Sequence, residues 1–206
     1  MYSYTGLLQW SGGYWPLVIA ALIAYLMGNI SPSILIARAH GIDIRKEGSG
    51  NAGTTNVLRV LGKKAAAATL IIDVLKGTVA VVPAGVFFGR QAAMICVVAA
   101  MVGHVWPIFF RFKGGKGVAT AFGALCGLDP LLGFSALGVV VVFVLITRRM
   151  SAGSIAGAVF FPVLTYFLEP DFIVLGSVLA LIVLWKHRSN IGRLVRGEEP
   201  EMSFKK

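Results

Sequence analysis

Six apolar segments, most of them long enough to cross a lipid bilayer, constrain the fold of this chain more than any other feature. A transmembrane helix needs about 20 apolar residues, with a range of roughly 17–25. The segments cover residues 15–39, 65–88, 92–110, 131–147, 151–168 and 172–185. Only 14% of the residues are charged, against about 25% in soluble domains. The sequence therefore predicts an all-α integral membrane protein.

A shorter apolar stretch, residues 118–128, decides the predicted number of crossings. It is expected to form a seventh helix that extends through the glycines before it, and a re-entrant segment is the alternative. We therefore expect about seven transmembrane helices in one polytopic domain that covers residues 1–206. The first apolar run lacks a basic segment before it, so a cleaved signal peptide is not expected.

Basic residues mark one side of the membrane. Of the 19 Lys and Arg residues, all except Lys76 and Arg90 fall in the loops 38–64, 111–117, 148–150 and 186–206. Basic loops stay on the cytoplasmic side, so the N-terminus is predicted to be periplasmic and the C-terminus cytoplasmic. The net charge of +10 is then a topology signal, and no nucleic-acid partner is expected. Because the outer loops are very short, we expect the active site at the cytoplasmic face.

The loop "GSGNAGTTN", residues 48–56, is typical of an anion-binding site. Glycines let successive backbone N–H groups turn toward one point, and the N-terminus of a following helix, expected after Asn56, would add further donors. The loop places Gly48, Gly50 and Gly53 among small polar residues, namely Ser49, Asn51, Thr54, Thr55 and Asn56. A Walker loop would need Gly-Lys-Ser/Thr where Gly53-Thr54-Thr55 stands, so nucleotide hydrolysis is not indicated. A flexible turn between helices is the plainer alternative, but it leaves this density of glycines and small polar residues unexplained.

Two further basic segments lie at predicted membrane exits. In "FKGGKGVAT", residues 112–120, Lys113 and Lys116 flank a glycine pair, which suits phosphate binding; simple membrane anchoring would explain the lysines but not the glycines. In "KHRSNIGRL", residues 186–194, His187 could act as a general acid–base or a donor. Interfacial snorkelling explains the arginines of this segment, and for His187 and Asn190 both interpretations stay open. Helix packing explains Ser151 as well as function does.

Ionisable groups inside the predicted spans are costly and usually paired. Asp73 and Lys76 are three residues apart on one helix face, so they are expected to pair with each other and to support the basic site. His104 is the third such residue. The two cysteines, Cys96 and Cys126, lie in apolar runs and are read as reduced thiols. No metal-ligand cluster and no cofactor motif is apparent.

Several of these segments together resemble one enzyme family. The resemblance rests on "YLMGNIS", "GSGNAGTTNVLRVLGKK", "DVLKG", "GHVWPIFFRFKGGKGVATAFG", "SAGSI" and "HRSNIGRL", which cover nearly the whole chain in order. The pattern is similar to that of the bacterial acyl-phosphate-dependent glycerol-3-phosphate acyltransferases, the PlsY family. This resemblance implies a seven-helix protein of the bacterial inner membrane that transfers a fatty acyl group from acyl phosphate to the 1-hydroxyl of glycerol 3-phosphate. The implied products are lysophosphatidic acid and inorganic phosphate.

The resemblance also implies roles for individual residues. The loop would hold the donor phosphate, with the implied ligands Ser49, Gly50, Asn51, Gly53, Thr55 and Asn56. A second set would bind glycerol 3-phosphate; its members are Arg59, Lys116, Ser151, His187 and Asn190. All of this set except Arg59 would also carry the catalysis, with a substrate phosphate helping to take the proton. The implied partners are the two substrates, the lipid bilayer and a soluble enzyme that forms acyl phosphate. Thr54 departs from the alanine that the family usually has there.

Two alternatives compete with this interpretation. A transporter of an organic phosphate would also use basic, glycine-rich loops, but it would need an accessible outer vestibule, which the short outer loops do not easily supply. An acyltransferase that uses acyl-CoA or acyl carrier protein would need additional basic surface for an adenine nucleotide or a docking face for the carrier.

Overall fold

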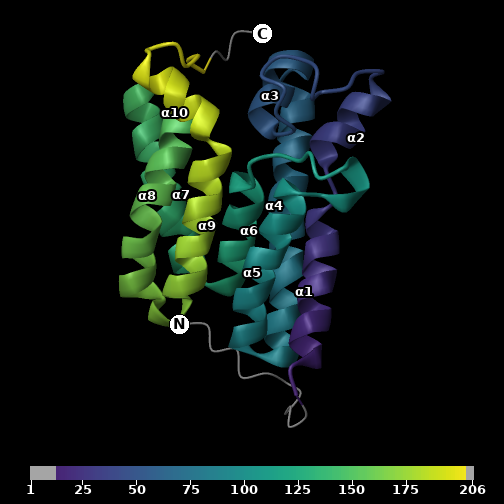
Figure 1. Ribbon diagram of the computed structural model, residues 1–206, viewed down its shortest axis with the longest axis vertical. Coiled ribbons are helices and arrows are strands. Elements are labelled where there is room, and N and C mark those ends of the chain that lie inside the picture. The colour runs from purple at the N-terminus through teal and green to yellow at the C-terminus, as the bar shows by residue number, and fades with distance from the viewer. Residues whose placement is uncertain (1–12, 203–206) are drawn as a thin grey trace. The chain divides into compact units, whose positions relative to one another are not determined.

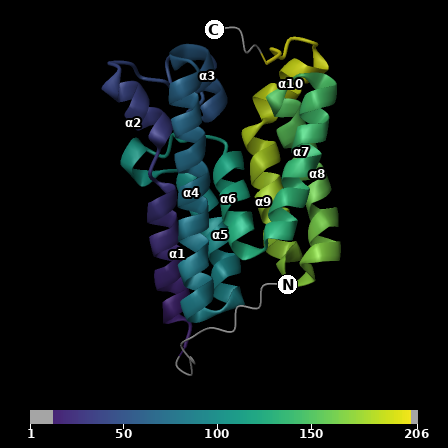
Figure 2. The ribbon, with the colours of Figure 1, turned by 180° about the vertical axis from the view of Figure 1, so that it is seen from behind.

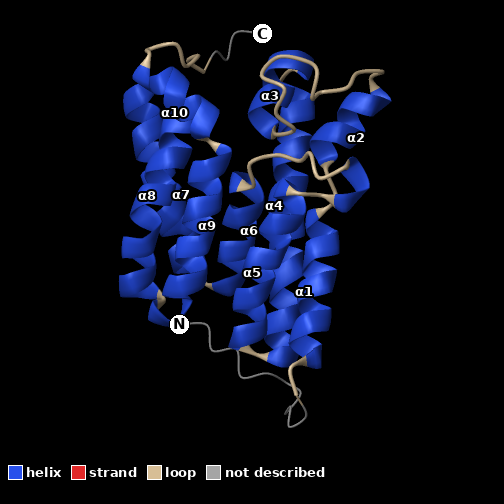
Figure 3. Cartoon of the chain, viewed as in Figure 1, coloured by secondary structure: helices blue, strands red, loops and turns tan. Residues whose placement is uncertain are grey.

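The computed structural model describes residues 13–202, and within that range it consists of helices and loops (Figures 1 and 3). The helices are α1 (Trp15–Gly28), α2 (Pro32–Ala39), α3 (Thr54–Leu61), α4 (Lys63–Phe88), α5 (Arg90–Val105), η1 (Ile108–Phe110), α6 (Val118–Leu128), α7 (Pro130–Thr147), α8 (Met150–Leu168), η2 (Pro170–Phe172), α9 (Ile173–Lys186) and α10 (Arg188–Val195). The predicted helical class is confirmed. Residues 1–12 and 203–206, and with them the predicted sides of the two termini, lie outside the described range.

By its internal contacts the chain divides into two compact units, which meet in sequence between Pro130 and Leu131. Unit 1 contains α1 to α6, and unit 2 contains α7 to α10. Five segments of the described chain are long and apolar enough to cross a membrane. A sixth is obtained when the pair 170–186 and 188–195, bent by 59°, is counted as one span. Counting the shorter α6 as well would give the predicted seven, and that number, the orientation and the single domain stay predictions.

In unit 1, α1 packs on α5, and α4 packs on both α5 and α6 (Figures 1 and 2). Glycines at these crossings allow the close spacing of the helices. A methyl group on Gly28 would overlap the Ala100 carbonyl oxygen of α5. In the same way, a methyl group on Gly77 would overlap the Thr120 carbonyl oxygen of α6. Small residues allow such close backbone approach between helices in lipid, where there is no hydrophobic force to bring helices together.

The segment 15–39, predicted as one span, is two helices with a break at residues 29–31. Pro32 begins α2 and has no N–H to donate into the preceding turn. The buried Asn29 compensates, since its Nδ2 donates to the Tyr25 carbonyl at 2.6 Å and its Oδ1 accepts from the Ile108 N–H at 2.5 Å. Such irregular backbone at membrane depth needs internal partners of this kind.

A small apolar core holds the polar loop between α2 and α3. Ile34, Ile44 and Val57 are almost fully buried in it, together with Phe110 from η1. Helix α3 begins at Thr54, three residues before the predicted start at Val57. Gly53 is extended and its carbonyl already accepts from the Asn56 and Val57 N–H groups, so the helical turn closes earlier than the polar composition of 54–56 suggested.

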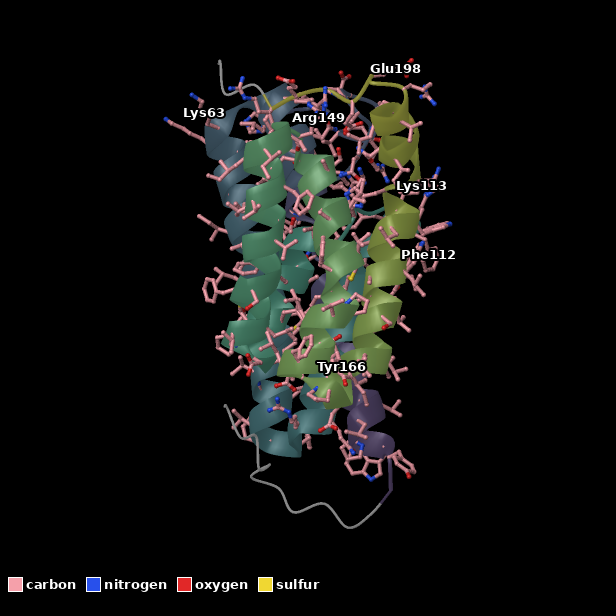
Figure 4. The ribbon with its side chains drawn as sticks, turned by 90° about the vertical axis from the view of Figure 1, so that its left-hand side faces the viewer. Lys63, Phe112, Lys113, Arg149, Tyr166 and Glu198 are labelled. Atoms are coloured by element: carbon pink, nitrogen blue, oxygen red, sulfur yellow. The ribbon has the colours of Figure 1, made fainter. Side chains whose placement is uncertain are left out.

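Unit 2 is built on α8, which packs against α7 and α9. A methyl group on Gly153 would lie 2.5 Å from the Val140 carbonyl oxygen of α7, and one on Gly157 would lie 2.7 Å from the Val140 side chain. On the α9 side, a methyl group on Gly176 would lie 2.9 Å from Thr165 of α8. Arg149 and Glu198 lie at one end of this unit, and Tyr166 lies toward the other end of α8 (Figure 4).

We expect Gly77→Ala to lower the thermal stability of the detergent-solubilised protein by about 1–3 kcal/mol, because the added methyl group must push α4 and α6 apart. The matched control is Gly138→Ala in α7, where no described atom lies within 4 Å of the new methyl group. Alanine there should be neutral or stabilising by up to about 1 kcal/mol. Equal melting temperatures for the two variants would contradict the close-contact account of the α4–α6 crossing.

Candidate active site

The loop that precedes α3 in unit 1 turns through two glycines in left-handed conformations. Gly48 has φ +57° and Gly50 has φ +71°. Backbone of this kind costs other residues energy and directs successive N–H groups toward one side, which forms an anion-binding concavity. A methyl group on Gly48 would also overlap Oδ1 of Asn56, and one on Gly50 would lie 3.2 Å from the Arg45 carbonyl oxygen. These glycines let the chain turn sharply. The Ser49 N–H donates to Asn56 Oδ1 and the Gly50 N–H to the Glu47 carbonyl, so these two groups shape the loop, and anion binding stays a prediction.

Asn56 fixes the shape of this loop from inside. It is 1% exposed, and its Nδ2 donates to the carbonyl oxygens of Ile44 and Glu47 at 3.1 and 2.9 Å. Its Oδ1 accepts from the Ser49 N–H at 2.8 Å. Both amide protons are thus engaged within the loop, so the contacts of Asn56 are those of a shaping residue. A direct contact between Asn56 and a phosphate stays a prediction.

The donors that this loop presents lie between Asn51 and Thr55. The N–H groups of Asn51, Ala52, Thr54 and Thr55 have no acceptor within the described chain. The Thr54 hydroxyl is also buried without a hydrogen-bond partner among the described residues. The first N–H groups of a helix point outward and carry its positive dipole end. Together these donors can receive an anion at the start of α3.

The second glycine loop, residues 113–117, lies against the first. A methyl group on Gly115 would lie 2.5 Å from the Ala52 carbonyl oxygen, so the two backbones touch at that point. Lys116, half-buried, comes next, and Gly117 follows with φ +83°. Lys113 and Phe112 are exposed and project outward (Figure 4). Lys113 and Lys116 were both predicted to suit phosphate binding. Of the two, Lys116 is the one next to Gly115, where the loops touch.

A buried polar cluster lies in unit 1, within the predicted spans. Asp73, Lys76 and His104 are 1%, 5% and 5% exposed. Lys76 Nζ lies 2.7 Å from Asp73 Oδ1, which confirms the predicted pair. His104 Nδ1 lies 2.9 Å from Lys76 Nζ and 3.1 Å from the Thr120 hydroxyl. Each ionisable group at this depth therefore has a charged or polar partner.

Two arginines near the first loop differ in their surroundings. Arg45 donates to Asp43 from Nε at 2.9 Å and from Nη2 at 3.0 Å, and these hydrogen bonds hold the pKa of Asp43 down to about 2. Arg45 also donates to the Phe110 carbonyl at 3.4 Å, so it ties the loop to η1. Arg59, the predicted phosphate ligand, is exposed on α3.

In unit 2, the structure brings Ser151 and Asn190 together around a residue that sequence reasoning missed, Glu199. The Ser151 hydroxyl and Asn190 Nδ2 each donate to Glu199 Oε1 at 2.6 Å, and Arg193 Nε donates to Oε2 at 2.7 Å. Arg149 Nε donates to the Glu199 carbonyl at 2.9 Å. The tail after α10 is thereby held against the start of α8. Glu198 and Glu199, acids in an otherwise basic segment, were the only signal in the sequence.

The carboxylate of Glu199 stays ionised under neutral conditions. Burial works against the charge, but the hydrogen bonds from Ser151, Asn190 and Arg193 outweigh it and hold the pKa of Glu199 below its ordinary value of 4.5. Because the Ser151 proton points at this carboxylate, its oxygen lone pairs are left to accept a hydrogen bond from another hydroxyl.

His187 lies at the bend between α9 and α10 and is 3% exposed. Its Nδ1 lies 2.8 Å from the Val183 carbonyl oxygen. A carbonyl can only accept, so Nδ1 carries the proton and Nε2 is the basic nitrogen of the neutral ring. Among residues 13–202, no group of three or more His, Cys, Asp or Glu side chains could hold a metal ion.

Comparison with known proteins identifies relatives over nearly the whole chain. The sequence model of a family described as "Glycerol-3-phosphate acyltransferase" matches residues 18–197. A glycerol-3-phosphate acyltransferase of Thermoanaerobacter sp. (strain X514) is 44% identical over 191 residues, which are 91% of this chain and 96% of the relative. The enzyme of that name from Agrobacterium fabrum is 42% identical over 205 residues, covering 98% and 99% of the two chains.

A solved structure is similar as well. It is the crystal structure of PlsY, an integral membrane glycerol 3-phosphate acyltransferase, in its glycerol 3-phosphate form. Its sequence is 33% identical to this chain, the match covers 91% of this chain and 96% of that one, and the TM-score is 0.86. The lysophosphatidic acid form of the same protein matches with a TM-score of 0.83.

We expect Glu199→Gln to reduce thermal stability near neutral pH by about 1–3 kcal/mol, because three donors lose a charged acceptor. A depressed pKa stabilises the folded state above the unfolded-state pKa, and this contribution disappears as the pH falls through the folded-state value. The difference between wild type and Glu199→Gln should therefore shrink below about pH 4.5. Melting curves from about pH 7.5 to about pH 3.5 would measure this.

The matched control is Glu201→Gln. The Glu201 side chain is 56% exposed and lies 3.8 Å from Arg149, so its loss should change stability by less than about 1 kcal/mol. A difference between wild type and Glu199→Gln that is the same at both ends of the pH range would contradict the assigned role of the Glu199 charge.

Proposed function

This chain belongs to the glycerol-3-phosphate acyltransferase family of integral membrane proteins, and from that premise we propose that its acyl donor is an acyl phosphate. In the proposed reaction, the 1-hydroxyl of sn-glycerol 3-phosphate attacks the acyl carbonyl. A new ester C–O bond forms and the bond between the acyl carbon and the phosphate oxygen breaks. The hydroxyl proton leaves with phosphate, so the products are lysophosphatidic acid and inorganic phosphate.

One observation carries this proposal: the N–H groups of Asn51, Ala52, Thr54 and Thr55, which have no acceptor in the described chain, lie beside the loop of Lys116. Backbone N–H groups at a helix N-terminus suit a phosphate, and a lysine next to them supplies a compact positive charge. We assign the donor phosphate to this place, with Ser49, Thr54 and Thr55 as hydroxyl ligands. Gly50 and Gly53 provide the backbone conformation, and Asn56 maintains it.

We assign the glycerol 3-phosphate to the residues that the family resemblance implies for it, of which Ser151, His187 and Asn190 belong to unit 2. The lone pairs of Ser151 can accept the hydrogen bond of the attacking hydroxyl, since the Ser151 proton is directed at Glu199. His187 offers Nε2 for the same purpose or for the proton, and Asn190 is held beside Ser151 by the shared carboxylate. Within unit 1, Lys116 and the exposed Arg59 stay proposed as sources of positive charge for a phosphate group. Catalysis then depends on positioning and electrostatics more than on a protein nucleophile.

The proposed setting is the inner membrane of a bacterium, with the reaction at its cytoplasmic face. Segments long and apolar enough to cross a bilayer support the membrane assignment, and bacterial relatives support the kind of cell. Since acyl phosphates are reactive compounds, a soluble enzyme that makes them is the partner we expect. The product is an early intermediate of phospholipid synthesis.

The proposed donor is tested with purified protein in detergent or lipid vesicles, glycerol 3-phosphate and palmitoyl phosphate, with palmitoyl-CoA as the comparison donor. We expect equal amounts of inorganic phosphate and lysophosphatidic acid with palmitoyl phosphate, and no product with the CoA ester. Product from the CoA ester alone would keep the acyltransferase but reject the donor and the phosphate-loop assignment. Uptake of glycerol 3-phosphate into vesicles without turnover would indicate a transporter instead.

We expect Gly50→Ala to raise the KM for acyl phosphate about tenfold, because a left-handed conformation costs an alanine about 1–2 kcal/mol and the loop will shift to relieve it. The matched control is Gly41→Ala, where φ is +73° and no described atom lies within 4 Å of the new methyl group. Both variants carry similar strain, so they should lose similar stability. A KM that changes equally in both, or in neither, would contradict the assignment of the donor phosphate to this loop.

A further inference from the structure

We propose that His104 is a positioning residue that holds the two glycine loops in register, and that the buried pair of Asp73 and Lys76 fixes the ring tautomer that this requires. His104 touches neither substrate in this account. The inference rests on the proposed function in one respect, namely that the loops bind a phosphate group. It does not depend on which acyl donor carries that phosphate.

The tautomer follows from the surroundings of Lys76. An ammonium group has three N–H donors and no acceptor. Lys76 Nζ has three neighbours at hydrogen-bond distance: Asp73 Oδ1 at 2.7 Å, the Ile30 carbonyl oxygen at 2.5 Å and His104 Nδ1 at 2.9 Å. A proton on Nδ1 would point at a positively charged nitrogen. Nδ1 therefore accepts, and the single proton of the neutral imidazole lies on Nε2.

Asp73 and Thr120 support the same assignment. The Asp73 carboxylate balances the charge of Lys76, so the ring need not be charged to make the buried cluster neutral overall. The Thr120 hydroxyl, 3.1 Å from Nδ1, can donate to the ring nitrogen as a second hydrogen-bond partner. Asp73 Oδ1 also lies 3.3 Å from Nδ1 and could accept a proton from it. The distances to Lys76 Nζ and to the Thr120 hydroxyl are shorter, 2.9 and 3.1 Å. These closer neighbours favour the arrangement in which Nδ1 is an acceptor and Nε2–H is a donor.

The other end of the ring faces the place where the loops touch. A methyl group on Gly115 would overlap His104 Nε2 and would lie 2.5 Å from the Ala52 carbonyl oxygen. The backbone near Gly115 is also tied to the end of α5, because the Gly115 N–H donates to the His104 carbonyl at 3.3 Å. The Nε2–H group is thus placed at the point where the 113–117 loop passes Ala52.

The position of this donor controls the spacing of the phosphate-binding groups. Ala52 provides one of the N–H groups assigned to the phosphate, and Lys116 directly follows Gly115. A change at Nε2 would let the two loops move relative to each other without removing a ligand. Supporting contacts of this kind change the affinity of a site by about 10- to 100-fold in metal centres. For a phosphate site, we expect about tenfold.

Two variants separate the ends of the ring. His104→Asn places an amide oxygen near the position of Nδ1, so it keeps an acceptor for Lys76 but lacks a group that reaches the loops. His104→Gln reaches to about the position of Nε2 with an amide N–H, but it leaves Lys76 without its nitrogen acceptor. His104→Asn therefore loses the contact with the loops, and His104→Gln loses the acceptor for Lys76. Each variant serves as the control for the other.

KM and kcat with palmitoyl phosphate and glycerol 3-phosphate, and the melting temperature in detergent, are measured for both variants. We expect His104→Asn to raise the KM for acyl phosphate about tenfold with a melting temperature close to that of the wild type. For His104→Gln, we expect a lower melting temperature and a KM within about threefold of wild type. A KM that follows the melting temperature in both variants would overturn the proposal, because His104 would then be only structural.

Calorimetric titration with inorganic phosphate distinguishes failure of this inference from failure of the proposed donor. If the wild type gives no product from acyl phosphate, but phosphate binds about tenfold more weakly to His104→Asn than to His104→Gln, the donor assignment fails and the inference stands. Equal Kd values for phosphate in the two variants would overturn the inference even with an active wild type. Absence of phosphate binding to the wild type would overturn both.

Discussion

The ammonium group of Lys76 is the charge on which much of unit 1 depends. An unpaired charge at membrane depth is very costly, so every group around it must be in place when the unit folds. Its partners come from different parts of the chain: Asp73 on its own helix, the carbonyl of Ile30 at the break between α1 and α2, and His104 on α5. The same buried charge therefore stabilises both the broken first span and the loops that follow α5.

The break in the first span illustrates this dependence. Pro32 removes a backbone donor and leaves irregular backbone at residues 29–31, which in lipid would carry unsatisfied polar groups. Lys76 donates a hydrogen bond to the carbonyl of Ile30. The side chain of Asn29 donates to the carbonyl of Tyr25 and accepts from the N–H of Ile108. The polar groups at the break are thus bound by Lys76 of α4 and by the segment that follows α5. Helices that cross closely at Gly28 and Gly77 bring those partners within reach.

The features that the sequence predicted well are those that depend on neighbours along the chain. Long apolar runs predict helices because backbone groups in lipid must be satisfied within a segment, and the glycine-rich segment 48–56 predicts a loop before the next helix. The pairing of Asp73 with Lys76 follows from their separation of one helical turn. These predictions are confirmed.

What the sequence did not reveal depends on contacts between distant residues. Glu199 lies 48 residues from Ser151, and no periodicity connects the two. The family resemblance implied that Asn56 is a phosphate ligand, which stays a prediction. It did not reveal the contacts of Asn56 with the carbonyls of Ile44 and Glu47 and with the N–H of Ser49. The break in the span 15–39 was missed although Asn29, Ser31 and Pro32 mark it, because the apolar residues on both sides make the segment long enough to be read as one span. In each case the polar atom finds a partner that only the folded chain provides.

Two of the buried carboxylates, Asp73 and Glu199, also limit how a proton can be moved. Asp73 is committed to Lys76, and Glu199 has a depressed pKa because it accepts three hydrogen bonds. A base works best when its pKa lies near the operating pH, so Glu199 is poorly suited to take a proton from a hydroxyl. A phosphate monoester has a second pKa of about 6, which makes the substrate's own phosphate a better base than this carboxylate. On the same argument, we expect that in the proposed reaction Glu199 directs the Ser151 proton away from the acceptor hydroxyl, and that His187 or the substrate phosphate takes the proton of that hydroxyl.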